Sequence, residues 1–205
     1  MSDDTPRDSA ESAGDGAADQ AEGRTSNRED GREPPYRIHA QYVKDFSLEN
    51  PKAPECFMDP LVRQVRPQLE VDVTTRALGD RLVEVLLQAN VTGRIEPDTE
   101  RERTAYLIEL SYGAAVEIGN VPKDAIDPLL RVEIPRLLFP YVRQIVSTAT
   151  QDSGHNLLML PTIDFLGLYR WKQREGQIDS ATADQVADEQ PRAESAGAPS
   201  TSQAS

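Results

Sequence analysis

The stretch from Thr104 to Ile118 alternates between apolar and polar positions with a period of two. Its odd positions are mostly small or polar, although Leu107 stands there beside Glu109. Because successive side chains of a strand point to opposite faces, the pattern predicts a long strand with one buried and one mostly solvated face. The buried face is formed by the even positions Tyr106, Ile108, Leu110, Tyr112, Ala114, Val116 and Ile118.

Weaker alternation predicts three further strands, at Tyr36–Leu48, Gln68–Thr74 and Leu82–Val91. In the second, Leu69, Val71 and Val73 face one side while Glu70 and Asp72 face the other; the third is apolar on both faces, which is typical of an interior strand. Short polar connections, including a charged hairpin at 96–103, favour an antiparallel sheet. In the first strand, one face is predicted to hold Tyr36, Ile38, Ala40, Tyr42, Phe46 and Leu48.

The period changes after Ile118, where helical spacing begins. Residues 124–134 are expected to form a short helical piece around Pro128. Leu137, Tyr141, Ile145 and Ala149 then recur every four residues, beside a second row of Leu138, Val142 and Val146, which predicts an amphipathic helix. Pro140 is expected to kink this helix or begin it afresh. Thr162 can cap a last helix over residues 163–174, which is apolar on most sides.

Strands followed by helices predict an α+β fold, a four-stranded antiparallel sheet with helices packed on one face. One sheet and two helices offer more apolar surface than they can hide from each other. We therefore expect an obligate oligomer with an interface on the order of 2,000 Å² or more.

The two ends of the chain differ from this core in composition. Residues 1–33 hold ten acidic and four basic residues, and residues 176–205 hold five acidic and one basic, so their net charges are −6 and −4. The remaining residues then carry −3 of the formal −13. We predict disordered acidic tails at 1–35 and 175–205 around one domain at 36–174. We expect these tails to serve solubility, and the alternative is that they steer a basic partner electrostatically.

The sequence contains no pattern typical of a nucleic-acid, metal, phosphate or catalytic site. The acidic balance argues against nucleic acid, the chain has neither a long apolar run nor a secretory signal, and a single cysteine fits a reducing cytoplasm. The two histidines, His39 and His155, have no ligand partners at metal spacing, and no phosphate-binding or nucleophile motif occurs. We expect no cofactor, no metal and no catalysis. Glu70 and Asp72 fit an ordinary solvated strand, and Cys56 a small buried side chain.

Four blocks of sequence resemble the SecB protein-export chaperones. Tyr42–Pro51 with Ala53-Pro54 resembles their first strand and crossover loop, and Thr104–Leu110 their fourth strand. Leu138–Arg143 is similar to the start of their long helix, and Leu157–Tyr169 to their last segment. Gly113-Ala114, where the family usually has two glycines, and the longer charged hairpin at 96–103 depart from the pattern.

The resemblance implies an ATP-independent holdase that keeps secretory preproteins unfolded in the cytoplasm and hands them to the motor ATPase SecA. It implies a homotetramer, a dimer of dimers. It assigns motor binding to Asp45, Glu49, Leu107 and Glu109, and the dimer–dimer contact to Ile108, Leu110 and Tyr112. The alternation agrees with part of this, since Asp45, Leu107 and Glu109 fall on solvated strand faces.

A chaperone of this kind must expose apolar side chains in solution, and the loop and helices can supply them. We predict a client groove lined by Pro51, Pro54, Phe57, Met58, Leu138, Val142, Phe165, Leu168 and Trp171. Core packing is the competing interpretation for the helix residues. The alternative function is an oligomeric adaptor that binds one folded partner through its acidic sheet face.

Overall fold

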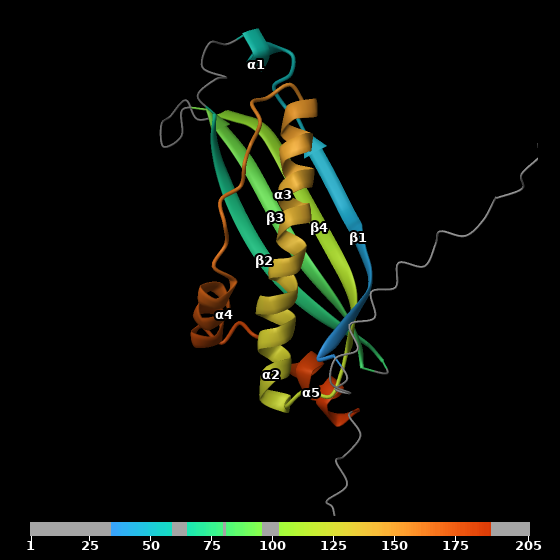
Figure 1. Cartoon of the computed structure of the whole chain (residues 1–205). Coiled ribbons are helices and arrows are strands. Elements are labelled where there is room, and N and C mark those ends of the chain that lie inside the picture. The colour runs from blue at the N-terminus through green and yellow to red at the C-terminus, as the bar shows by residue number, and fades with distance from the viewer. Residues whose placement is uncertain (1–33, 59–64, 80, 96–102, 190–205) are drawn as a thin grey trace, which may run out of the picture. The chain divides into compact units, whose positions relative to one another are not determined.

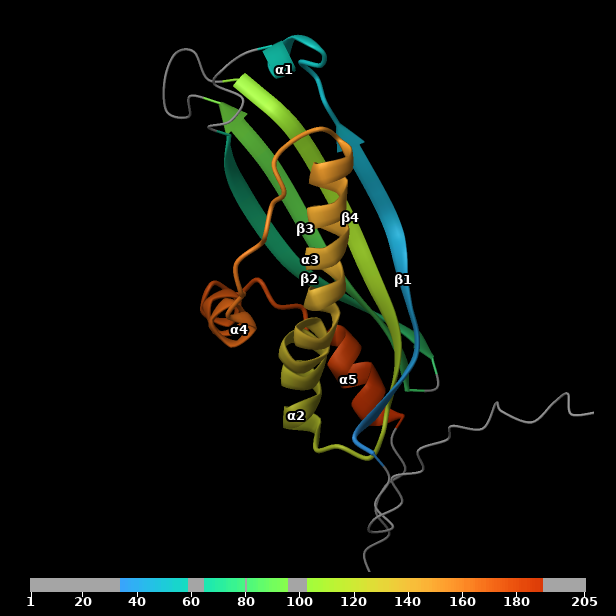
Figure 2. The same cartoon turned by 45° about the horizontal axis from the view of Figure 1, so that its top comes forward.

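The computed structural model describes residues 34–58, 65–79, 81–95 and 103–189 of the 205-residue chain (Figures 1 and 2). The predicted tails outside 34–189 and most of the charged hairpin at 96–103 lie outside the described residues. The elements in chain order are β1 (Tyr36–Glu49), α1 (Glu55–Met58), β2 (Arg66–Gly79), β3 (Leu82–Ile95), β4 (Arg103–Ile118), α2 (Lys123–Pro128), the π-helical turn η2 (Leu129–Glu133), α3 (Ile134–Asp152), α4 (Phe165–Arg174) and α5 (Ala181–Asp188).

The four strands form one antiparallel sheet in the order β1-β4-β3-β2. Helix α3 lies across one face of this sheet and contacts β3 and β4, and both views show it running along the strands (Figures 1 and 2). The predicted α+β class is confirmed. We call the face that α3 covers the helix face and the opposite one the outer face.

The alternation of β4 is confirmed, because every even position from Tyr106 to Ile118 is buried. These side chains meet Leu138, Val142 and Val146 of α3 in one hydrophobic core. Strand β3 is an interior strand, as expected, and contributes Val83, Val85, Leu87, Ala89 and Val91 to the same core. At about 25 cal/mol per Å², burial of these side chains is the main stabilising contribution to the fold.

The predicted faces of β1 are wrong in the middle of the strand. Its pairing with β4 shifts register between Ile38 and Ala40 and again between Val43 and Asp45. Each extra residue moves the following side chains to the other face. Ala40 and Tyr42 therefore pair with Ala115 and Gly113 on the outer face, and the second shift returns Phe46 and Leu48 to the helix face.

The two apolar rows of α3 have different surroundings. The row of Leu138, Val142 and Val146 is fully buried against the sheet, whereas Leu137 and Tyr141 remain exposed. Pro140 lies inside a helix that continues from Ile134 to Asp152. Pro140 and Arg136 both lie on the exposed side, so water can satisfy the carbonyl group that proline leaves without a donor.

After α3 the structure differs from the predictions in two places, the cap of α4 and the presence of α5. The side chain of Asp164, not Thr162, caps α4 by accepting from the backbone N–H of Gly167 at 2.9 Å. Helix α5 lies within the segment predicted to be a disordered tail, and it is folded because Ala183 and Val186 are buried against the rest of the domain. Two small apolar residues among acidic and polar ones are too weak a signal for composition to detect.

A buried carboxylate, Glu84, lies on the outer face of β3. It accepts hydrogen bonds from the Tyr42 hydroxyl at 2.6 Å, from Lys44 Nζ at 2.8 Å and from Arg76 Nη2 at 2.9 Å. Burial alone would raise the pKa of Glu84, but the hydrogen bonds from Lys44, Tyr42 and Arg76 together lower it to about 2. Burial and the bond to Glu84 raise the pKa of Tyr42 to about 12.

This cluster makes stability depend on pH in the acid range. Because the pKa of Glu84 is lower in the folded chain than its ordinary value of 4.5, its contribution is complete above that value and is lost as the pH falls towards about 2. We expect Glu84→Gln to lower the free energy of unfolding at neutral pH by about 3 kcal/mol and to flatten its decline below pH about 4.5. Urea unfolding at several pH values measures both effects, and Glu109→Gln on the same face should change little.

Candidate functional site

Strand register arranges the outer face in rows that cross all four strands. One row holds Asp45, Ser111, Gln88 and Asp72, from β1 to β2. The next row holds Ser47, Glu109, Asn90 and Glu70, and the one after it Glu49, Leu107, Thr92 and Gln68. Since neighbouring strands lie about 4.8 Å apart, these rows place acidic side chains from β1, β4 and β2 on one small surface.

The first two rows form the floor of a hollow of about 570 Å³. Four carboxylates line it, from Asp45, Glu70, Asp72 and Glu109, and Lys172 of α4 supplies one ammonium group. The formal charge of these groups is therefore −3, and we call this surface the acidic hollow. Polar and aromatic side chains complete its lining, among them Gln88, Asn90, Ser111, Trp171 and Gln177.

The four residues assigned to motor binding lie together on this face. Asp45 and Glu109 line the acidic hollow, while Glu49 and Leu107 are partners in register in the adjoining row. Leu107 is half-buried and faces the same side as the carboxylates, so it adds an apolar contact beside a negatively charged surface. This arrangement suits a segment that carries both basic and apolar side chains.

Sequence reasoning missed that Glu70 and Asp72 belong to the same hollow. Their alternation with Leu69, Val71 and Val73 was visible, but only the strand order brings β2 into line with Glu109. It also missed the ion pair between Lys172 and Asp72, which attaches α4 to the hollow. Trp171, predicted to lie in the client groove, instead lies at the edge of the hollow.

The crossover loop is fixed to the end of α3 by His155. The His155 ring packs between the rings of Phe57 and Tyr106, with centroids 5.1 and 4.8 Å away. Its Nε2 lies 3.0 Å from Asn50 Oδ1, and Asn50 Nδ2 donates to the carbonyl of Ser153 at 3.3 Å. Because Asn50 Nδ2 donates to Ser153, Asn50 Oδ1 faces the ring and accepts from Nε2. Burial lowers the pKa of His155 and so favours the neutral ring. Figure 1 shows α1 at the same end of the sheet as the end of α3.

The predicted client groove is partly wrong. Leu138, Val142 and Phe165 are buried in the core of the single chain and cannot line an accessible groove. Leu168 is half-buried beside Tyr169, whereas Pro51, Pro54, Phe57 and Met58 are exposed. Leu138 and Val142 were assigned to the groove because helical periodicity does not show which of the two apolar rows of α3 packs on the sheet.

Exposed apolar side chains instead come from the crossover loop and from the segment that joins α3 to α4. Met58 is 84% exposed, and Met159 and Leu157 are 60% and 55% exposed. Leu157 and Met159 line a groove of about 260 Å³ together with Pro140, Arg143 and other residues of α3. We call Phe57, Met58, Leu157 and Met159 the exposed apolar set.

A second apolar surface joins β1 to the outer row of α3. Tyr141 is 51% exposed and stacks on Tyr112 with ring centroids 5.7 Å apart. Val43 pairs with Tyr112 in register, and Val43, Phe46 and Leu137 are also exposed. We call this the lateral apolar surface. Ile108 and Leu110 were assigned to contact another subunit, but both lie beneath α3 of their own chain, with Leu110 only 2% exposed.

Among the residues that the structure describes, no helix combines the length and the apolar character needed to cross a membrane.

Comparison with known proteins gives consistent results. A family model described as "SecB: Preprotein translocase subunit SecB" matches residues 29–176. The chain is 42% identical over 137 residues to a "Protein-export protein SecB" of Rhodospirillum centenum, which covers 66% of this chain and 78% of that relative. It is 38% identical over 160 residues to the protein of the same description from Sphingopyxis alaskensis, covering 77% of this chain and 85% of the relative.

One solved structure shares the fold. It is a SecB-like chaperone of Mycobacterium tuberculosis in complex with a ChAD peptide from an antitoxin. The TM-score is 0.50 at 14% identity, and the match covers 62% of this chain and 90% of that one. At this identity the likeness extends to the fold alone.

Proposed function

Because the chain belongs to the SecB family of preprotein translocase subunits, we propose that it is an export chaperone that holds secretory precursors unfolded without ATP and delivers them to the motor ATPase SecA. The observation that carries this proposal is the pairing of exposed apolar side chains with an acidic hollow on another part of one small domain. The first surface suits nonnative chains of any sequence, and the second suits one basic partner.

The exposed apolar set is the proposed client surface. Burying 1,000 Å² of client would contribute on the order of 25 kcal/mol, most of which ordering and association consume. Binding should therefore be broad in sequence and reversible. Two of its four side chains are methionines, Met58 and Met159, whose flexible thioethers adapt to differently shaped partners.

The acidic hollow is the proposed motor surface. Its carboxylates attract cationic segments over roughly 8–10 Å at physiological ionic strength and so speed their encounter. Leu107 and Trp171 at its borders add apolar contacts. Holding and delivering a client require no covalent bond to form or break. We therefore propose a binding protein rather than an enzyme, acting in the cytoplasm.

A homotetramer, a dimer of dimers, is the proposed assembly. The lateral apolar surface on β1 and α3 is the part of the domain that a second copy would cover, because Val43, Phe46, Leu137 and Tyr141 otherwise face water. Ile108 and Leu110 support this contact indirectly, since they form the surface on which α3 packs.

Capture of unfolded proteins tests the client surface. We expect the chain to suppress aggregation of several unrelated unfolded proteins without nucleotide, and Met58→Asp to weaken that capture about tenfold, the equivalent of 1.4 kcal/mol of lost apolar burial. Phe57→Asp, another member of the exposed apolar set, should also weaken it. Leu78→Asp adds the same charge at an exposed apolar position of β2 and should bind clients as the unchanged chain does. An equal loss of client capture in Leu78→Asp and Met58→Asp would show that clients do not bind at the exposed apolar set.

The second candidate function is that of an adaptor that binds one folded partner through the acidic hollow. The four clustered carboxylates favour it because they would attract a basic surface on such a partner. The range of unfolded proteins that the chain binds distinguishes the chaperone from the adaptor. An adaptor would bind its partner but leave the aggregation of unrelated proteins unchanged.

A further inference from the structure

The crossover loop presents the thioether of Met58 to water. Helix α1 is attached to the domain by the two residues before it, because Cys56 is buried and the ring of Phe57 packs on His155 with centroids 5.1 Å apart. Met58 follows them at the end of the helix and is exposed. The contacts that hold α1 in place therefore do not include Met58.

Met159 is held outward by the segment that joins α3 to α4. The backbone N–H of Leu158 donates to Thr150 Oγ1 at 3.2 Å, and the Thr150 hydroxyl donates to the carbonyl of Ser147 at 2.9 Å. Side chains alternate along this segment, since Leu158 and Leu160 pack on the core while Met159 is exposed. The hydrogen bonds fix this alternation and keep the Met159 thioether in solvent.

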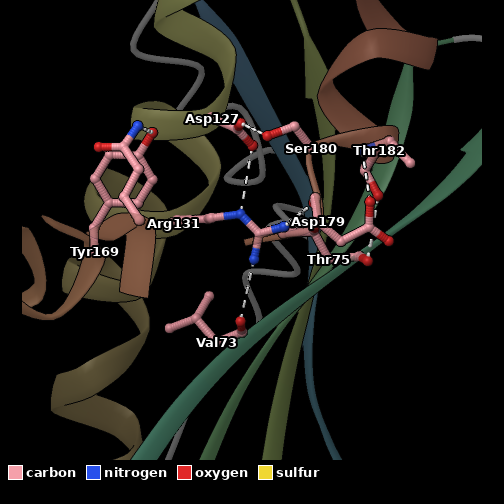
Figure 3. A network of polar contacts seen from close by, with 10 residues as sticks. Val73, Thr75, Asp127, Arg131, Tyr169, Asp179, Ser180 and Thr182 are labelled. Atoms are coloured by element: carbon pink, nitrogen blue, oxygen red, sulfur yellow. Dashed lines mark hydrogen bonds and ion pairs between the residues drawn. The ribbon is translucent and has the colours of Figure 1, made fainter. Parts of the chain in front are cut away.

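Neither thioether stabilises the fold. Among the residues that the structure describes, neither the buried core nor the side chains packed against it include a methionine. At strand β2, the tertiary contacts are those of charged and hydroxyl groups. Arg131 Nη1 donates to the Val73 carbonyl at 3.4 Å, and the Ser180 hydroxyl donates to Asp127 Oδ2 at 2.6 Å (Figure 3). A chemical change at either exposed thioether should therefore leave the domain folded.

We propose that Met58 and Met159 are sites of reversible oxidation, and that hydrogen peroxide weakens client binding through them. The sulfur of each thioether attacks one oxygen of the peroxide, the O–O bond breaks, an S–O bond forms, and the other oxygen leaves as water. Sulfur is oxidised and the peroxide is reduced, each by two electrons. This inference rests on the proposed client-holding function and adds a modification that controls it.

Oxidation should weaken client binding because the product is polar. A sulfoxide oxygen is a strong hydrogen-bond acceptor, and covering it with apolar client side chains removes its water without replacing the hydrogen bond. Two of the four members of the exposed apolar set, Met58 and Met159, would change in this way. Phe57 and Leu157, the other two members, carry no sulfur.

The competing site of oxidation is Cys56, the single cysteine of the chain. It is 3% exposed against 84% for Met58, so peroxide should reach the thioethers first. The products also differ in what reduces them. A small thiol reductant reverses a sulfenic acid or a disulfide, whereas a methionine sulfoxide needs its own reductases, one for each configuration at sulfur.

The test treats the full-length protein with hydrogen peroxide, removes the peroxide and then measures client capture. The probe is a labelled secretory protein kept unfolded by reduction and carboxymethylation, followed by anisotropy. Peptide mass spectrometry should find about 16 Da added at Met58 and Met159 while Cys56 remains a thiol. We expect capture to weaken about three- to tenfold and to recover with methionine sulfoxide reductases of both specificities, but not with dithiothreitol. Affinity for SecA should not change, because no methionine lines the acidic hollow in the described part of the chain.

The matched variant carries both Met58→Leu and Met159→Leu, which replace the thioethers by apolar side chains that peroxide does not oxidise. Each protein is compared with itself before and after peroxide, so any effect of leucine on capture cancels. We expect the ratio of the two affinities to stay near one in this variant.

Three results would overturn the proposal. They are unchanged capture by a chain whose two thioethers are oxidised, an equal loss in the double variant, and oxidation of Cys56 before either thioether. Failure of the untreated chain to capture any unfolded protein would instead overturn the proposed function, so the two failures are distinguishable.

Discussion

Glu109→Lys is expected to reduce affinity for the SecA motor by about a hundredfold while leaving client capture intact. Glu109 lies between Ser47 and Asn90 in register, at the centre of the row that also holds Glu70. Reversal changes the formal charge of the acidic hollow from −3 to −1 and places an ammonium group in the path of a basic segment. At an effective dielectric constant of about 20, replacing the attraction between the Glu109 carboxylate and a nearby cation by repulsion changes the interaction energy by several kcal/mol before salt screening. We therefore expect the binding free energy to weaken by about 3 kcal/mol.

Calorimetric titration of SecA into each variant measures this loss. Asp124→Lys makes the same change of charge at an exposed position of α2 that does not line the hollow, and it should retain motor affinity. Raising the salt concentration should weaken binding of the unchanged chain and narrow its difference from Glu109→Lys. Motor affinity retained in Glu109→Lys would show that the acidic hollow is not the docking surface.

Tyr141→Asp is expected to convert the proposed tetramer into smaller species. Tyr141 is 51% exposed in the single chain, stacks on Tyr112 and lies beside the exposed Leu137 and Val43. A carboxylate buried there between two copies would have no counterion among these apolar neighbours, and burying an unpaired charge costs several kcal/mol. The chain itself should stay folded, because Tyr141 does not belong to its core.

Light scattering measures the outcome, since each chain contributes 22.7 kDa. We expect a mass of about two chains for Tyr141→Asp and about four for the unchanged protein. Gln151→Asp, at an exposed position near the end of α3, is the matched control and should remain a tetramer. An intact tetramer in Tyr141→Asp would exclude the lateral apolar surface as the contact between dimers.

Local patterns predicted most of the fold, and tertiary pairing accounts for what they missed. Period-two alternation identified β4 and its buried face because a strand between two neighbours has little freedom to deviate. The edge strand β1 deviates twice, at the irregularities near His39 and Lys44. Lys44 interrupts the predicted apolar face and is a local sign of the second irregularity. Periodicity found both rows of α3 but could not tell which row, that of Leu138 or that of Tyr141, packs on the sheet.

The acidic hollow was predictable in part. Asp45 and Glu109 came from the resemblance together with the alternation, but Glu70 and Asp72 join them only through the strand order β1-β4-β3-β2. Strand order depends on long-range pairing, which a single sequence does not encode locally. Helix α5 was not predicted for a different reason, because its buried residues Ala183 and Val186 are few and small against an acidic background.

Native mass spectrometry with and without an unfolded secretory precursor tests the central claim most directly. Without nucleotide, we expect a tetramer that binds the unfolded precursor and does not bind the same protein after folding. A tetramer that binds only a folded partner, or no unfolded precursor at all, would contradict the claim that this chain is an export chaperone.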